Sequence, residues 1–190
     1  MDKIKNNCTF VQMVNFNFER EKAIAALTYI CNQLGGEWDK YSLLKILYFS
    51  EKVHLAKYGR PITGDRIVAY KYGPVPHCSY QIINDRTEVY FSQEEGNIIK
   101  ALRPLELDYL SETDKECLDI SISENKTLDF GRLKDKSHDA AYNKAYEQGE
   151  HTEISYLDIA ECGGANPDML EYIKYTSEIS NSILHDSSHR

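Results

Sequence analysis

One segment constrains the fold more than any other part of the chain. It runs from Asp39 to Val75 and reads DKYSLLKILYFSEKVHLAKYGRPITGDRIVAYKYGPV. Within it, a helix start, a glycine stop, a proline–glycine turn, an aromatic strand and a Gly-Pro exit follow one another directly. Because each of these limits where the next can lie, the segment predicts one particular backbone path.

The first part of this segment predicts a helix that begins after Asp39 and ends at Gly59. The aspartate is a good N-cap, glycine accepts the left-handed conformation that ends many helices, and Pro61 prevents continuation. Apolar residues between positions 43 and 49 cover most of the helix circumference, so we expect burial on more than one side. Lys45 interrupts that run, and we expect it to snorkel, with its stem along apolar neighbours and its ammonium reaching polar partners.

A tight turn and a strand follow the helix. Pro61 and Gly64 favour a turn, because proline presets φ and glycine accepts positive φ. Residues 66–72, RIVAYKY, have the β-branched and aromatic composition of a strand. The turn therefore predicts a sharp change of direction from the helix into a sheet.

Residues 73–76, GPVP, are expected to leave the sheet, because proline cannot donate to a β-ladder. Two interpretations of this exit are open. It is either only a stiff connection, or a rigid loop that presents Tyr70, Tyr72 and His77 to a partner at little ordering cost.

The rest of the chain alternates helical patterns with turn signals. We expect an amphipathic helix over 18–34, a short helix over 77–84, and a hairpin of 88–92 with 98–102. Together with 66–72, this hairpin would form one small antiparallel sheet. Further helices are expected over 111–123, 138–148, 154–161 and 166–184, with Ser111 and Asp114 as a capping box, Thr127 as a second cap, and Asn166 before Pro167 at the start of the last helix.

These elements predict a mainly α (α+β) protein. The expected architecture is a single helical-bundle domain with a small antiparallel β-sheet or hairpin insertion. We expect an N-terminal arm over 1–17, the domain over 18–184, and a polar tail over 185–190. No repeat or linker divides the 190 residues.

Composition restricts the possible partners. The net charge is −8, and no basic stripe appears, so direct nucleic-acid binding is not expected. An acidic chain suits a basic partner, and the 14 tyrosines suit an interface. Five scattered cysteines argue against disulfides and a zinc site. With no signal peptide or transmembrane run, a cytoplasmic protein is expected.

No motif predicts catalysis. The chain has no HExxH, P-loop, GxSxG or Rossmann glycine pattern. His77 beside Cys78, His138 beside Asp139, and a Cys31–His54 pair are the nearest candidates, and each has an ordinary structural explanation. We therefore expect no enzyme, no cofactor and no metal site.

The same segment carries a family resemblance. The order LLKILYFSEKVHLAKYGRPITGD, a strand, then YGPVP resembles the SocA-like antitoxin family, known for its Panacea domain. QLGG before the central helix and the pattern L-x-x-x-SH-x-x-x-Y at 133–142 also fit, so the resemblance spans about residues 18–160. It departs from the family at His77, where relatives often have a small serine-like residue, and at Tyr142, where tryptophan is usual.

The resemblance implies an antitoxin of a bacterial or prophage toxin–antitoxin pair. Such proteins neutralise a toxin, encoded next door, by direct binding; the alternative is an adaptor that delivers the toxin to a protease. The oligomeric state stays open. The expected partner-binding residues are Tyr70, Tyr72, Gly73, Pro74, Val75 and His77. The family pattern marks as scaffold Lys45, Tyr48, Gly59, Pro61, Gly64 and His138.

Overall fold

A computed structural model of the protein describes residues 14–103 and 107–187. Its α-helices are α1 (Arg20–Gln33), α2 (Lys40–Tyr58), α3 (His77–Asn84), α4 (Glu112–Asn125), α5 (Phe130–Ser137), α6 (Ala140–Tyr146), α7 (Tyr156–Cys162) and α8 (Pro167–Ser187). Its strands are β1 (Glu37–Asp39), β2 (Ile67–Tyr70), β3 (Gly73–Pro76), β4 (Phe91–Gln93) and β5 (Ile98–Ala101). Short 3-10 turns lie at Glu95–Asn97 and Leu107–Tyr109. The prediction of a mainly α protein with a small antiparallel β component is confirmed.

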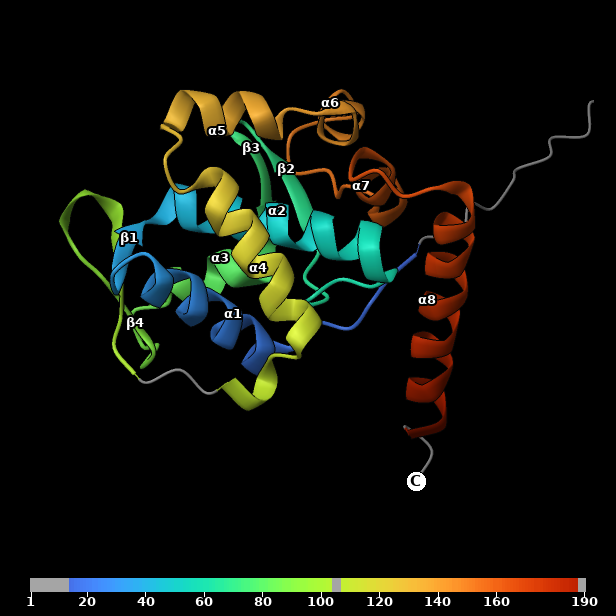
Figure 1. The fold of residues 1–190 in the computed structure, drawn as a ribbon, viewed down its shortest axis with the longest axis horizontal. Helices are drawn as coiled ribbons and strands as arrows, with labels where there is room; N and C mark the ends of the chain where they lie inside the picture. Colours follow the sequence, from blue (N-terminus) through green and yellow to red (C-terminus); the bar gives the residue numbers. More distant parts are fainter. Residues whose placement is uncertain (1–13, 104–106, 188–190) are drawn as a thin grey trace, which may run out of the picture.

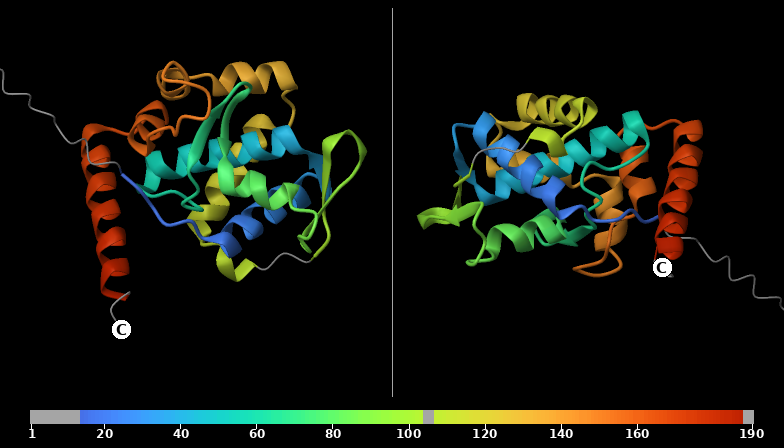
Figure 2. Two further views of the ribbon diagram at one scale, coloured as in Figure 1. Left: turned by 180° about the vertical axis from the view of Figure 1, so that it is seen from behind. Right: turned by 90° about the horizontal axis from the view of Figure 1, so that it is seen from below.

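Helix α2 runs through the middle of the molecule, with α4 on one side and the β2–β3 hairpin on the other (Figures 1 and 2). It also packs against α1, α5 and α7. Its ends are those expected: the Asp39 carboxylate accepts the Ser42 N–H at 2.9 Å, and Gly59 is left-handed with φ 69°. Burial on several sides is confirmed, and it follows from a helix whose apolar residues surround its axis.

The strands form two sheets, so the prediction of a single sheet is wrong. The β4–β5 hairpin pairs with β1, in the order β1-β5-β4, and β2 pairs only with β3 among the named strands. In the first sheet Trp38 stands opposite Ile99. Strand β1 has only three residues, the last of which, Asp39, also caps α2. Three residues are too short a pattern to predict a strand from the sequence.

Residues Gly73–Pro76 do not leave the sheet; they form β3, antiparallel to β2. The two prolines are tolerated because Pro74 and Pro76 stand opposite Ala69 and Ile67. The Ala69 N–H donates to the Thr152 carbonyl, and the Ile67 carbonyl accepts from Ile154, both at 2.8 Å. These β2 groups therefore point away from β3, and the ladder needs no N–H donor at either proline position.

Two helix starts in the second half differ from expectation. Asp129, not Thr127, caps α5, since its carboxylate accepts the Arg132 N–H at 2.9 Å. The helix expected over 138–148 is shorter, because His138 ends α5 and Asp139 caps α6.

Two other caps are confirmed. Ser111 and Asp114 form a reciprocal capping box at the start of α4. The Asn166 side chain accepts the Met169 N–H at 2.8 Å, with Pro167 as the first residue of α8. Helix α7 begins only at Tyr156, because the residues before it hydrogen-bond to β2.

Helix α8 stands at one end of the molecule, beside the segment that leads into α1 (Figure 1). Ser177 Oγ lies 3.1 Å from both the backbone nitrogen and the carbonyl oxygen of Asn15, and the Phe16 ring meets the Tyr156 ring edge-on at 5.4 Å. The expected arm therefore packs on the domain at 14–17, and residues 1–13 lie outside the described residues. Of the expected tail, 185–187 form the end of α8, and 188–190 lie outside the described residues.

The turn after α2 is held by a buried carboxylate. Glu51 accepts hydrogen bonds from the backbone of Ile62 at 2.5 Å and of Thr63 at 2.9 Å, and also from the Thr63 hydroxyl. Gly64 then passes close under the arm: a Cβ on Gly64 would lie 2.0 Å from the Asn17 carbonyl oxygen. This contact leaves no room for any side chain at position 64.

Gly64→Ala should therefore destabilise the protein by about 3 kcal/mol, from left-handed strain plus displacement of the arm. Gly96→Ala is the matched control, because Gly96 has φ 72° against 67° for Gly64 but nothing within 4 Å of its Cβ position. Strain alone should cost this control about 1 kcal/mol. Urea denaturation of both variants measures the difference; equal losses would show that the contact with Asn17 is unimportant.

Candidate functional site

A groove of about 420 Å³ opens beside the turn of the β2–β3 hairpin. We call it the aromatic groove, because five of the residues that line it carry aromatic rings. Its lining residues are Tyr41, Leu44, Tyr70, Tyr72, Val75, Tyr80 and Phe130, with Asp39, Lys40, Gly96 and Asn97. These residues come from the end of β1, α2, the β2–β3 hairpin, α3, the turn between β4 and β5, and the start of α5.

Three of the rings form a connected cluster. Phe130 lies with its ring centroid 4.4 Å from that of Tyr41 and 5.7 Å from that of Tyr72. The Tyr41 hydroxyl donates to the Tyr72 carbonyl at 3.0 Å, which ties the hairpin turn to α2. Tyr72 and Phe130 are each 50% exposed. The cluster therefore offers aromatic surface to solvent while its backbone is held in place.

Lys45 supports the hairpin from below. It is only 1% exposed, and its ammonium donates to the Pro74 carbonyl at 2.6 Å and lies 5.1 Å from the centre of the Tyr41 ring. The expectation of a snorkelling lysine is wrong, because the ammonium ends inside the protein. Burial lowers the pKa of Lys45 to about 7.

The hairpin turn approaches the α5–α6 junction very closely. Gly73 has φ 104°, and a Cβ there would lie 2.6 Å from Ser137 Oγ, 2.7 Å from Lys45 Nζ and 3.2 Å from the His138 ring. His138 stacks on Tyr142 at 4.2 Å between ring centroids, and burial lowers its pKa, with a further contribution from nearby lysines. The contacts fix the turn against two helices.

The structure distributes the expected partner-binding residues over two layers. Tyr70, Tyr72 and Val75 line the aromatic groove, whereas Gly73 and Pro74 are buried. His77 is half-buried at the start of α3, and its Nδ1 lies 2.8 Å from the Tyr70 hydroxyl. Desolvation and the neighbouring Arg66 charge lower the pKa of His77.

Sequence reasoning missed other groove residues: Tyr41, Leu44, Tyr80 and Phe130. Tyr41 and Phe130 are far apart in the chain, so no local pattern could have joined them. The sequence offered one indication for Phe130. It is an aromatic residue directly after a helix cap, at a position that the spacing of apolar residues does not assign to the core.

The residues expected to act as scaffold hold elements together. The Tyr48 hydroxyl donates to Asp139 Oδ2 at 3.2 Å, and the same oxygen accepts from Lys52 at 2.7 Å. A Cβ on Gly59 would lie 2.4 Å from the Tyr172 ring, so α8 packs directly on the end of α2. Pro61 belongs to the turn anchored by Glu51.

The other candidates for chemistry are engaged in packing contacts. The Cys31 thiol donates to the Gly36 carbonyl at 3.0 Å, and burial raises its pKa. The His54 ring instead faces the Arg60 carbonyl at 2.7 Å and the Asp114 carboxylate at 3.1 Å. Among the described residues, no three His, Cys, Asp or Glu side chains are arranged to hold a metal ion. No described helix is long and apolar enough to cross a membrane.

Comparison with protein families gives one match. The model described as antitoxin SocA-like, Panacea domain, matches residues 43–143. The chain belongs to the SocA-like antitoxin family. The matched residues run from α2 to α6, so they contain the β2–β3 hairpin and its support. Neither the curated proteins nor the solved structures contain a match to the chain.

Membership of this family assigns the chain a general antitoxin role. The resemblance noted in the sequence is thereby confirmed, over a core somewhat shorter than residues 18–160. The aromatic groove lies within or beside this core, since its lining residues fall between 39 and 130.

Replacing Lys45 by methionine tests whether the buried ammonium titrates. The pKa of Lys45 is lowered on folding, so the unfolded chain binds its proton more strongly, and stability should rise with pH above about 7. Between pH 6.5 and 8.5, the free energy of unfolding of the wild type should rise by about 2 kcal/mol relative to Lys45→Met. Urea denaturation at the two pH values measures this; parallel pH profiles would contradict it.

Proposed function

We propose that this protein neutralises its cognate toxin by direct protein–protein binding in the cytoplasm, and that the toxin contacts the aromatic groove. The toxin is expected to be encoded next to this gene. The observation that carries the proposal is the pair of half-exposed rings, Tyr72 and Phe130, on a fixed hairpin and helix. Aromatic residues of this kind dominate binding energy at protein interfaces.

The rigidity of the groove supports this choice of surface. The turn that carries Tyr72 is held by the Tyr41 hydroxyl, by the close approach of Gly73 to α5, and by the Lys45–Pro74 hydrogen bond of the adjoining strand. Binding therefore immobilises few groups, so the part of the entropic cost that comes from ordering side chains and loops is small.

The proposed mechanism is occlusion: the antitoxin covers the toxin's active or target-binding surface. Proteolytic delivery is the alternative, and the two differ in what happens to the toxin. Occlusion lowers toxin activity at constant abundance, whereas an adaptor shortens the toxin's half-life.

Tyr72→Asp and Phe130→Asp together should abolish protection when the protein is co-expressed with the neighbouring gene's toxin, and should weaken toxin binding at least 100-fold. Two buried apolar contacts are lost and two charges are desolvated. Growth assays and calorimetric titration with purified toxin measure the two effects. Pulse-chase labelling of the toxin identifies the mechanism.

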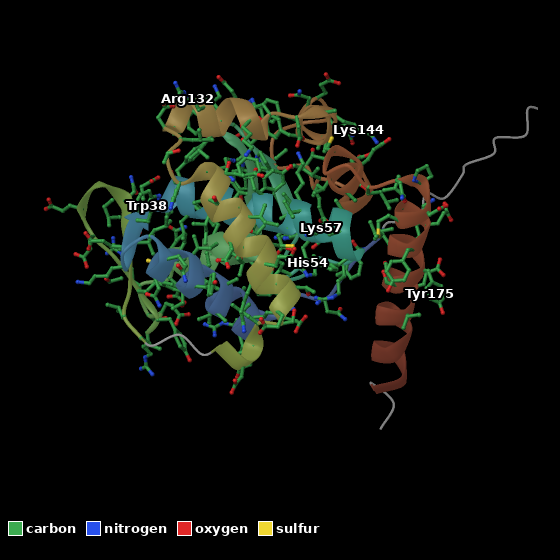
Figure 3. All side chains as sticks on the ribbon, in the orientation of Figure 1. Trp38, His54, Lys57, Arg132, Lys144 and Tyr175 are labelled. Carbon is green, nitrogen blue, oxygen red and sulfur yellow. The ribbon has the colours of Figure 1, made fainter. Side chains whose placement is uncertain are left out.

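Tyr175→Asp is the matched control. Tyr175 is 60% exposed on α8, and Figure 3 shows it well separated from Arg132 on α5, two residues from Phe130. The control should protect like the wild type. The proposed contact surface is wrong if the double variant folds and still binds the toxin with wild-type affinity.

A further inference from the structure

Carboxylates form ion pairs with seven of the 13 lysines in the described part of the chain. These seven are Lys22, Lys52, Lys57, Lys115, Lys136, Lys144 and Lys174. We call Lys40, which lines the aromatic groove, and Lys45 and Lys71, which lie against two of its rings, the groove lysines. None of the three forms an ion pair among the described residues. Lys100, Lys126 and Lys134 also lack an ion pair there and do not line the groove.

Each of the three groove lysines lies against a tyrosine of the groove. The ammonium of Lys40 is 5.7 Å from the centre of the Tyr80 ring, and that of Lys71 is 5.6 Å from the centre of the Tyr72 ring. Lys45 lies beneath Tyr41, as described above. The groove therefore combines aromatic surface with positive charge.

The hydrogen-bond acceptors of the Lys40 and Lys45 ammonium groups are neutral. Lys40 donates to the amide oxygen of Asn84 at 2.8 Å, and Lys45 donates to a backbone carbonyl. Such partners hold an ammonium in place without cancelling its charge. Desolvation lowers the pKa of Lys40, as expected for a partly buried cation without a counter-ion.

Two of the nearby carboxylates accept hydrogen bonds from backbone N–H groups. Asp39 lines the groove, but its Oδ1 accepts the Ser42 N–H at the start of α2, where the helix dipole balances a negative charge. Glu150 accepts from the backbone N–H of Lys71 at 3.2 Å. The groove lining thus carries one carboxylate, Asp39, and one ammonium, Lys40, and the Lys71 ammonium lies over the ring of Tyr72 at its edge.

We propose that the groove recognises a toxin segment in which an apolar side chain is adjacent to an aspartate or glutamate. The apolar side chain packs against Tyr72 and Phe130, and the carboxylate pairs with the ammonium groups of Lys40 and Lys71. This inference rests on the proposed function and adds the chemistry of the anchor. We call this aspartate or glutamate of the toxin the acidic anchor. The groove is thus expected to bind an acidic residue, although the net charge of the whole chain suits a basic toxin.

A phage-displayed library of random twelve-residue peptides, panned on the full-length protein, tests the anchor directly. The expected result is enrichment of peptides with an apolar residue next to Asp or Glu, and loss of that enrichment on the Tyr72→Asp, Phe130→Asp protein. Enrichment of Lys- or Arg-containing peptides, or no enrichment above an unrelated acidic protein, overturns the proposal.

Charge-changing variants test the same recognition with the toxin itself. Lys71→Glu and Lys40→Gln should each weaken toxin binding five- to twenty-fold, whereas Lys126→Glu, at an exposed position at the end of α4, should change it less than twofold. Circular dichroism and thermal unfolding confirm that each variant folds.

The pattern of losses separates the two proposals. If the aromatic double variant loses binding and the two lysine variants bind like the wild type, the proposed recognition of an acidic residue is wrong. The proposal that the toxin contacts the groove is then retained. If the aromatic double variant still binds, the toxin does not contact the groove, and both proposals are wrong.

Discussion

The hydrogen bond from the Lys45 ammonium to the Pro74 carbonyl links the central helix α2 to the β2–β3 hairpin. A buried ammonium is costly unless it is hydrogen-bonded. The carbonyl is available because Pro74 occupies a position of β3 that does not hydrogen-bond to β2. The bond fixes β3 on α2, and β3 in turn places the Tyr72 turn beside Tyr41. Because burial lowers the pKa of Lys45 to about 7, the same contact places a titratable ammonium next to the Tyr41 ring of the aromatic groove.

The parts of the fold that could be predicted are those set by residues close together in the chain. Asp39 and Gly59 define α2, and the Ser111–Asp114 box starts α4, because a cap and the groups it satisfies lie within a few residues. The errors arose where a distant segment decides the outcome. The GPVP stretch is a strand because the residues around Thr152 take up the outward-facing groups of β2. No pattern within 73–76 contains that information.

The residues of the candidate site likewise fall into those that the sequence could predict and those that it could not. Tyr70, Tyr72 and Val75 could be selected because they belong to the segment that carries the family resemblance. Phe130 could not, since its role depends on the path of the chain from α4 back to α2. An aromatic residue one position after the Asp129 cap has no periodic neighbours, and only the contact with Tyr41 explains its position.

In this chain, the residues that hold the hairpin in place and those that offer contact surface are largely different. Lys45, Gly73 and Pro74 are buried and act on the backbone of the hairpin. Tyr72 and Phe130 are half-exposed, and their side chains make none of the hydrogen bonds that hold the hairpin. The exposed residues can therefore be exchanged without loosening the support beneath them. A scaffold of this kind allows partner choice to change through surface rings and charges while the same buried lysine keeps the turn in place.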